Sequence, residues 1–112
     1  MGPDDAAEDL GEYAELVLDM AAKIPAGQVS SYGAIAAAVR VLTGRGSART
    51  VGAVMARHGD EVPWWRVVNA KGTLPEHLRT RAVPHWRSEG TPMTRGESPH
   101  VDMREAGWSP QL

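Results

Sequence analysis

The sequence predicts a single, mainly α-helical domain built around a helix-turn-helix, with one small β element. Three observations predict this fold class. The chain has 112 residues, which is the size of one domain, and its 42% of hydrophobic residues are enough for a modest core. Apolar residues recur at helical spacing through the first half of the chain. No run approaches the ~20 apolar residues of a membrane span, so no membrane partner is expected.

The first predicted helix spans residues 10–24, and a Pro-Ala-Gly stretch at 25–27 ends it. Before it, residues 1–8 are expected to form a disordered acidic leader, so that the domain itself covers residues 9–112. An acidic start is the opposite of a signal peptide's basic start, which favours a cytoplasmic protein. The apolar positions of this helix share one face: Leu10, Tyr13, Ala14, Val17, Met20, Ala21 and Ile24.

A helix-turn-helix is predicted over the next segment. Ser30 or Ser31 caps its first helix, and the Thr-Gly-Arg-Gly stretch at 43–46 breaks the chain. Ser47 then caps a helix over residues 48–58. One stripe of that helix is a plausible core face, formed by Val51, Val54, Met55 and His58. The other stripe has one arginine followed by small residues: Arg49, Gly52, Ala53 and Ala56.

The small-residue stripe has two interpretations. A helix that reads the major groove normally carries long polar side chains, which this stripe lacks. A bare face instead allows close approach to a narrow minor groove, with phosphate favoured at the helix N-terminus. The second interpretation is a contact between two helices inside the core.

The second half of the chain has weaker signals. Residues 62–69 are predicted as a strand or a buried extended turn, and residues 77–89 as a helix. Pro84 should stand at the start of that helix or break it. Residues 90–112 are predicted to be mostly loop, with a short strand at 101–105.

Charge and cysteine content restrict the function. Residues 1–20 hold seven acids and no base, whereas the rest holds twelve bases, ten of them Arg, against seven acids. A basic body suits nucleic acid, and the acidic segment either repels DNA or solvates a helix face. The absence of cysteine excludes disulfides, thiolate metal sites and cysteine nucleophiles. No cofactor is expected, and the histidines at 58, 85 and 100, which lack metal-ligand spacing, are expected at the surface or in the core.

Tryptophan is unusually frequent. The chain has four Trp and no Phe, and three of the Trp lie within 23 residues. Clustered indoles indicate a stacking surface or a tryptophan-rich core. Trp86 and Trp108 are predicted to belong to the core.

Three segments together resemble a known family. They read IPAGQVSSYGAIA at 24–36, SARTVGAVM at 47–55 and VPWWRVVN at 62–69. In order and spacing they resemble the DNA-binding domain of O6-alkylguanine-DNA alkyltransferases, over roughly residues 10–110. The resemblance implies a winged helix-turn-helix-like domain.

The family's catalytic motif is altered in this chain. Alkyltransferases carry Pro-Cys-His-Arg, with Cys as alkyl acceptor and His as its base relay, where this chain has Pro63-Trp64-Trp65-Arg66. Trp64 cannot form a thiolate, so alkyl transfer to cysteine is excluded and no enzyme is expected. The alkyltransferase-like proteins share the loss of Cys but keep the His, so Trp65 is a further departure.

The resemblance implies roles for individual residues. The family binds the minor groove through the second helix of its helix-turn-helix. An arginine finger at the start of that helix matches Arg49, and the tyrosine that helps to rotate the phosphate of the flipped nucleotide matches Tyr32. The expected DNA-binding residues are Tyr32, Ser47, Arg49, Thr50, Gly52 and Ala53.

A lesion pocket is implied beside this surface, with Trp64 as an apolar wall for the flipped base. Backbone groups just after the motif are expected to bind the purine edge, and Arg66 to hold the motif loop. His77 or Arg79 is expected to cover the base. The expected pocket residues are Tyr32, Pro63, Trp64, Trp65, Val67, Val68, Asn69 and His77.

The resemblance implies a monomeric sensor that binds duplex DNA containing O6-alkylguanine without repairing it. The alkyltransferase-like subgroup directs such lesions to nucleotide excision repair proteins, and binding of DNA would place the protein at the nucleoid. A general minor-groove binder or regulatory protein is the main alternative. A third possibility is an enzyme, either an alkyltransferase that uses another nucleophile or a glycosylase-like base flipper. The lack of an acidic residue at the expected pocket argues against the glycosylase.

Overall fold

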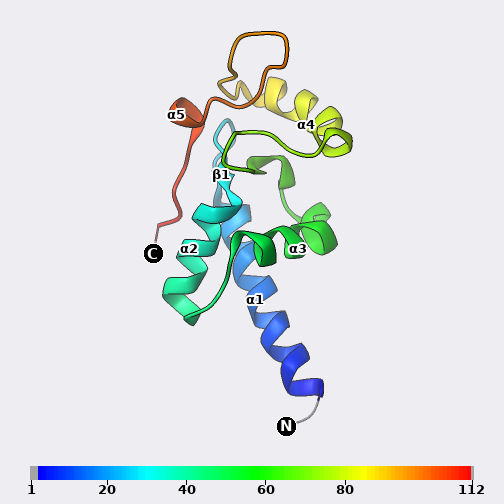
Figure 1. Ribbon diagram of the computed structural model, residues 1–112, viewed down its shortest axis with the longest axis vertical. Helices are drawn as coiled ribbons and strands as arrows, with labels where there is room; N and C mark the ends of the chain where they lie inside the picture. The colour runs from blue at the N-terminus through cyan, green and yellow to red at the C-terminus, as the bar shows by residue number, and fades with distance from the viewer. Residues whose placement is uncertain (1–2, 112) are drawn as a thin grey trace.

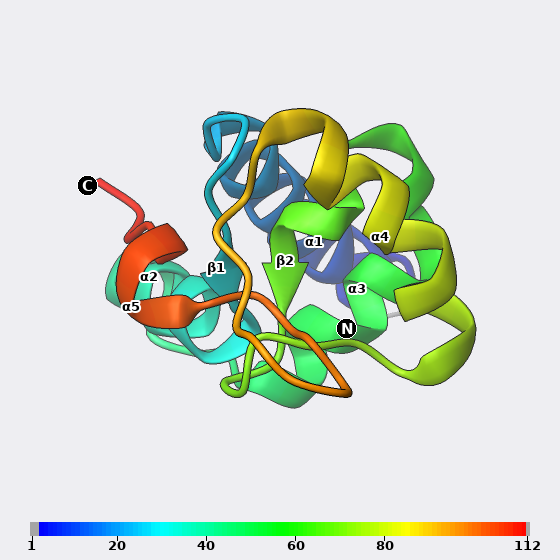
Figure 2. The ribbon, with the colours of Figure 1, turned by 90° about the horizontal axis from the view of Figure 1, so that it is seen from above.

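The computed structural model describes residues 3–111, with side chains from residue 11 onward (Figures 1 and 2). It confirms a mainly α-helical domain with a helix-turn-helix and a small β element. The strands β1 (Ser30–Ser31) and β2 (Val67–Val68) pair in parallel, and short 3-10 turns span Gly59–Glu61 and Trp64–Arg66. The helices are α1 (Pro3–Lys23), α2 (Tyr32–Thr43), α3 (Ala48–His58), α4 (Glu76–Glu89) and α5 (Met103–Ala106).

The first core cluster lies where α1, α2 and α3 pack against one another. Each helix contributes residues three or four positions apart, because that spacing gathers side chains on one face. Val51 and Met55 represent α3 in this cluster, as predicted. The fully or nearly buried residues of α1 and α2 are Tyr13, Val17, Met20, Ala21, Ile35, Ala36, Ala38 and Val39.

The small sheet joins this cluster to a second one. Successive residues of a strand point to opposite faces, so Val67 enters the first cluster and Val68 the second. The second cluster is centred on Trp86 of α4, which is fully buried, as predicted. Its indole Nε1 donates to the backbone oxygen of Trp65 at 2.7 Å. Trp108 is half-buried against the first cluster.

The caps of α2 and α3 fix the turn between them. The Ser31 hydroxyl, rather than that of Ser30, accepts a hydrogen bond from the backbone N–H of Ala34 at 3.0 Å. Gly44 ends α2 with φ of 77°, a left-handed conformation that glycine adopts without steric cost. The Arg40 guanidinium donates to the backbone oxygen of Gly46 and so ties the end of α2 to the start of α3.

The structure corrects the prediction for Pro84. The helix α4 runs through this residue without a break. Pro84 lacks the N–H that would bond the carbonyl of Thr80, yet both residues are exposed. Water can therefore hydrate that carbonyl, while Ala82 and Trp86 bury the opposite side of the helix.

Three other segments differ from prediction. The helix α1 already begins at Pro3, within the segment predicted as a leader; the domain boundary at residue 8 stays a prediction. Residues 62–69 contain both a 3-10 turn and the strand β2. The strand predicted at 101–105 is wrong: only Val101 forms a bridge, and α5 follows because Asp102 caps it. Within residues 3–111, no helix has the length and apolar character needed to cross a membrane.

Candidate nucleic-acid interface

The small-residue stripe of α3 faces solvent. Arg49, Ala53 and Ala56 are exposed, and a Cβ placed on Gly52 would meet no atom within 4 Å. The interpretation of this stripe as a buried helix contact is therefore wrong. The prediction of His58 on the core face is wrong: it is exposed, and its Nδ1 lies 3.6 Å from the Glu61 carboxylate. The helix thus presents a smooth surface with one long cationic side chain near its start.

The N-terminus of α3 is fixed by a reciprocal cap. The Ser47 hydroxyl accepts from the Thr50 backbone N–H at 3.2 Å, and the Thr50 hydroxyl accepts from the Ser47 N–H at 2.9 Å. The Thr50 hydroxyl also lies 2.6 Å from the Tyr13 hydroxyl. Thr50 therefore fixes the N-terminus of α3 against α1. The backbone N–H groups at a helix N-terminus favour the binding of phosphate oxygens.

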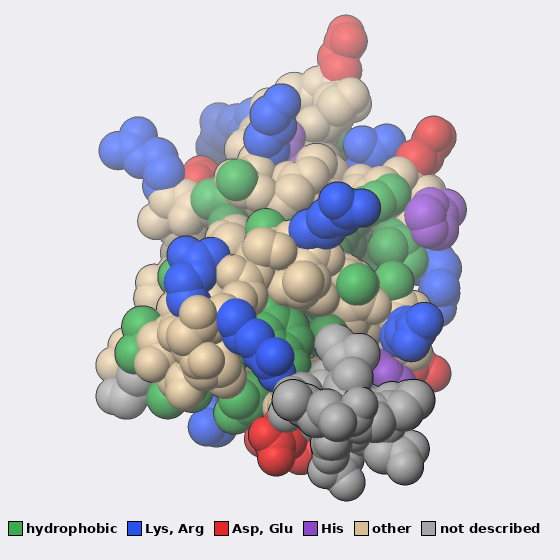
Figure 3. All heavy atoms as spheres, turned by 60° about the horizontal axis from the view of Figure 1, so that its bottom comes forward, with side chains coloured by type: hydrophobic (Ala, Val, Ile, Leu, Met, Phe, Trp, Pro, Cys, Tyr) green, Lys and Arg blue, Asp and Glu red, His purple; other side chains and the backbone are tan. Residues whose placement is uncertain are grey.

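Cationic side chains surround this region. Figure 3 shows Lys and Arg spread over the face drawn there, with Asp and Glu mostly at its edges. Arg45, Arg49 and Arg57 are exposed on and beside α3. Arginine in this arrangement suits a phosphate backbone.

Tyr32 begins α2 and contacts both core clusters. It is half-buried, and this burial raises the pKa of its phenol above the ordinary value of 10.0, so the hydroxyl stays neutral. Among the side chains described, none hydrogen-bonds this hydroxyl. The residue is thus held in place while its polar end keeps its hydrogen-bonding capacity.

Trp64 and Trp65 form an aromatic cluster with His85 of α4. The Trp65 indole stacks on the His85 ring, with centroids 3.7 Å apart and planes 9° from parallel. Trp64 meets both rings edge to face, at 5.8 Å from Trp65 and 6.0 Å from His85. The Arg81 guanidinium lies 5.4 Å from the centroid of the Trp64 ring.

Glu89 holds this turn from the end of α4. Its carboxylate accepts from Trp65 Nε1 at 3.0 Å, from Arg66 Nη2 at 2.5 Å and from the Gly27 backbone N–H at 3.1 Å. Burial alone would raise the pKa of Glu89, but these hydrogen bonds and the Arg66 charge lower it below its ordinary value of 4.5. Arg66 also donates to the Ile24 carbonyl at 2.9 Å, which confirms its predicted structural role.

Sequence reasoning missed three residues of this site: Arg81, His85 and Glu89. They stand four positions apart and therefore share one face of α4. The spacing was available in the sequence, but nothing local indicated that this face packs on residues 64–66.

The three residues after the Pro-Trp-Trp-Arg motif are less available for binding a purine than we expected. Val67 and Val68 are buried, and their strand pairs with β1. We expected the backbone N–H of Asn69 to bind a purine edge, but it donates to the backbone oxygen of Thr73 and is not free to do so. The Asn69 side-chain oxygen accepts hydrogen bonds from the backbone N–H groups of Lys71 and Thr73, and these bonds stabilise the turn that follows β2.

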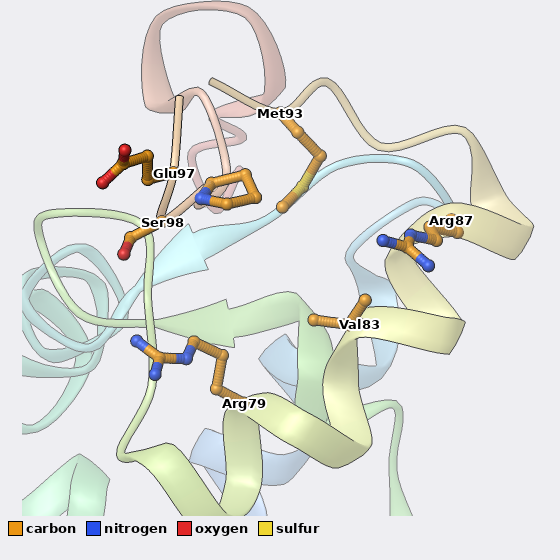
Figure 4. Close-up of a pocket in the computed structure, with 7 residues that line it drawn as sticks. Arg79, Val83, Arg87, Met93, Glu97 and Ser98 are labelled. Atoms are coloured by element: carbon orange, nitrogen blue, oxygen red, sulfur yellow. The ribbon is translucent and has the colours of Figure 1, made fainter. Parts of the chain in front are cut away.

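His77 and Arg79 have different surroundings, and neither residue is found beside Trp64 in a common pocket. His77 is exposed in the first turn of α4, while Arg79 lines a cavity of about 360 Å³ (Figure 4). Arg79, Val83 and Arg87 form one side of that cavity, and Met93 and residues 97–99 form the other. Arg79 is the one lining residue that we expected near the flipped base; the expected pocket residues themselves do not line this cavity, so it is not the expected lesion pocket. Within the part of the chain described, no group of three or more His, Asp or Glu side chains could hold a metal ion.

Comparisons with known proteins agree with this arrangement. Residues 12–89 match the family described as 6-O-methylguanine DNA methyltransferase, DNA binding domain. The fold superposes on S. pombe Atl1 in complex with damaged DNA containing O6-carboxymethylguanine, with a TM-score of 0.73 and 30% identity. A second structure, S. pombe ATL in complex with DNA, gives 0.72 and 30%. Both alignments cover 89% of this chain and 97% of the other. A search of curated proteins gave no match.

Proposed function

Because the chain belongs to the family of 6-O-methylguanine DNA methyltransferase DNA-binding domains, we propose that it is a non-enzymatic sensor of O6-alkylguanine in DNA. The proposal is carried by the absence of any cysteine from the chain, together with the resemblance of Pro63-Trp64-Trp65-Arg66 to the family's motif, by which we assign Trp64 to the alkyl-acceptor position. The similarity to Atl1 bound to damaged DNA supports recognition of a damaged base.

The proposed approach to DNA is through the minor groove. The exposed side of α3 around Gly52, Ala53 and Ala56 lets the helix backbone come close to the groove floor. The capped N-terminus of α3 and the surrounding arginines bind phosphates on either side. Ser47 contributes to this contact, whereas Thr50 acts mainly by holding the helix start.

Arg49 and Tyr32 would act on the flipped nucleotide. Arg49 is exposed near the start of α3, where its guanidinium can enter the base stack as the guanine leaves. The Tyr32 hydroxyl has the hydrogen-bonding capacity to hold the rotated phosphate. Flipping costs a few kcal/mol, and less for a poorly paired base, so O6-alkylguanine is favoured over guanine.

Trp64 would provide the wall against which the flipped base rests. Contact between a base and an aromatic ring contributes about 1–3 kcal/mol. The cation over this ring is Arg81, so we assign to Arg81 the covering role that we expected of His77 or Arg79. A base stacked on this face of Trp64 takes the space that the guanidinium occupies, so Arg81 would move outward and cover the base. An indole cannot accept the alkyl group, so the lesion stays intact and can be passed to nucleotide excision repair.

The test follows the alkyl group. A duplex with a labelled methyl at O6 of one guanine is incubated with the protein, and label in DNA, protein and free base is measured. The proposal predicts that all label stays on intact DNA, and that 2-aminopurine next to the lesion becomes more fluorescent as the base is flipped. Label on the protein or released base would overturn the sensor in favour of an enzyme. The step to excision repair is tested by adding purified damage-recognition and incision proteins, with faster incision at the lesion as the expected result.

A further inference from the structure

A hollow of about 250 Å³ lies between the second half of α1, the end of α2 and the C-terminal tail. Its apolar lining comes from all three segments: Leu16 and Met20, Leu42, and Trp108 and Pro110. An apolar cavity of ~150 Å³ accommodates benzene, so this hollow has room for a leucine or phenylalanine side chain.

Two large hydrophobic residues extend the hollow onto the surface. Leu42 lines it and is 54% exposed, and its neighbour Val41 is 73% exposed. A single exposed apolar side chain is ordinary, but adjacent ones beside an apolar hollow form the kind of patch that marks a protein interface.

The rim of the hollow on α1 is acidic. Asp19 and Lys23 both line the hollow, and Glu15 and Glu12, one and two turns before Asp19 on α1, are exposed. Residues 1–20 contain seven acids and no base. Among the side chains described on this side of α1, three exposed acids outnumber one base, and this excess disfavours DNA phosphates and favours a cationic partner. The combination of an apolar hollow and an acidic rim therefore favours a basic protein segment.

None of the residues that line this hollow belongs to α3. In Figures 1 and 2, α2 and the C-terminus are on the left of the molecule, whereas α3 is on the right. The exposed stripe of α3 and the hollow therefore share no residue.

We propose that this hollow is a docking site for a basic amphipathic helix of another protein. An apolar anchor of that helix enters between Leu16, Met20 and Leu42, and lysine or arginine residues beside the anchor pair with Asp19 and its acidic neighbours. Recognition of an amphipathic helix by anchors in a groove is a recurrent mode of protein binding. The site does not depend on the proposed lesion recognition and would allow DNA and the partner to bind together.

The test uses the full chain and a labelled synthetic helical peptide with leucines at positions i, i+4 and i+7 and lysines beside them. Binding is measured by fluorescence anisotropy. The lysine peptide should bind at least about tenfold more tightly than a peptide with glutamate in place of lysine, which is a difference of ~1.4 kcal/mol. Leu42→Asp and Asp19→Lys should each weaken binding by about tenfold or more. Leu42 and Asp19 are exposed, so both variants should fold, and circular dichroism checks this.

Ala37→Asp is the matched control, since it adds the same negative charge at another exposed position of α2 that does not line the hollow; it should change affinity by less than about threefold. A duplex bound to the protein should not displace the peptide. Equal binding of the lysine and glutamate peptides, no effect of Leu42→Asp, or displacement by DNA would overturn the proposal. So would light scattering that shows a dimer lost in Leu42→Asp, because a second copy would then be the occupant.

Discussion

The exposed stripe of α3 and the tryptophan turn at residues 64–66 are built in opposite ways. A Cβ on Gly52 would meet nothing, and the small residues beside it leave the stripe open. Trp65 and Arg66 are instead enclosed by His85 and Glu89 of α4. A surface that a DNA groove approaches needs space, whereas a ring that receives a flipped base needs a fixed position. In the proposed function, the open stripe admits the DNA groove and the crowded turn fixes the ring that meets the flipped base.

The largest expected effect comes from restoring the family's chemistry at the crowded part. Trp64→Cys together with Trp65→His should transfer methyl from O6-methylguanine about 10²- to 10⁴-fold faster than Trp64→Cys alone, because a positioned base contributes this factor. Transfer is measured as labelled methyl on the protein. Equally rapid transfer by the single variant would show that Trp65 does not explain the loss of relay function.

At the open part, Arg49→Ala should weaken binding to a lesion duplex by about 1.5–3 kcal/mol, the range of a hydrogen bond made by a charged group. The unfolding free energy should change little, because Arg49 is exposed. Arg57→Ala, on the same helix, is the control and should mainly reduce the salt dependence of binding. Equal losses for the two variants would leave Arg49 as an ordinary phosphate contact.

Glu89→Gln tests how the crowded part is held. It should lower the unfolding free energy by about 2 kcal/mol, because the carboxylate pairs with Arg66 with both side chains mostly buried. The folded-state pKa of Glu89 is lowered, so its contribution is complete above pH 4.5 and is lost as pH falls through the folded-state value. Chemical denaturation over this pH range should show that loss in the native protein and less of it in the variant. Glu97→Gln, at an exposed position, is the control; an identical pH profile in both variants would contradict the assignment.

The smallest expected effect separates stability from binding. Gly52→Ala should raise the unfolding free energy by about 0.5–1 kcal/mol, because alanine is the better helix residue and the added methyl has open space. The same methyl should reduce DNA affinity, since it stands between the helix and the groove. A rise in both quantities would indicate that DNA does not approach this stripe.

The comparison also explains what the sequence alone could predict. The stripe of α3 follows from spacing within eleven residues, and Ser47 marks its start, so local reasoning was sufficient. The support of Trp65 by His85 and Glu89 depends on contacts across 20 and 24 positions, which periodicity does not reveal. Pro84 misled because the burial of Trp86 against distant residues overrode its local preference, whereas at Val101 the missed signal was local, since Asp102 caps α5. The roles of the predicted DNA-binding and pocket residues stay predictions.

The most direct test of lesion recognition compares two duplexes that differ only by one O6-methylguanine. Affinity for each is measured at the same fixed salt concentration, because phosphate contacts make binding salt-dependent. The account predicts tighter binding to the lesion duplex, with the preference reduced in Trp64→Ala by up to the ~1–3 kcal/mol of base stacking. Equal affinity for both duplexes would contradict it and leave a general minor-groove binding protein.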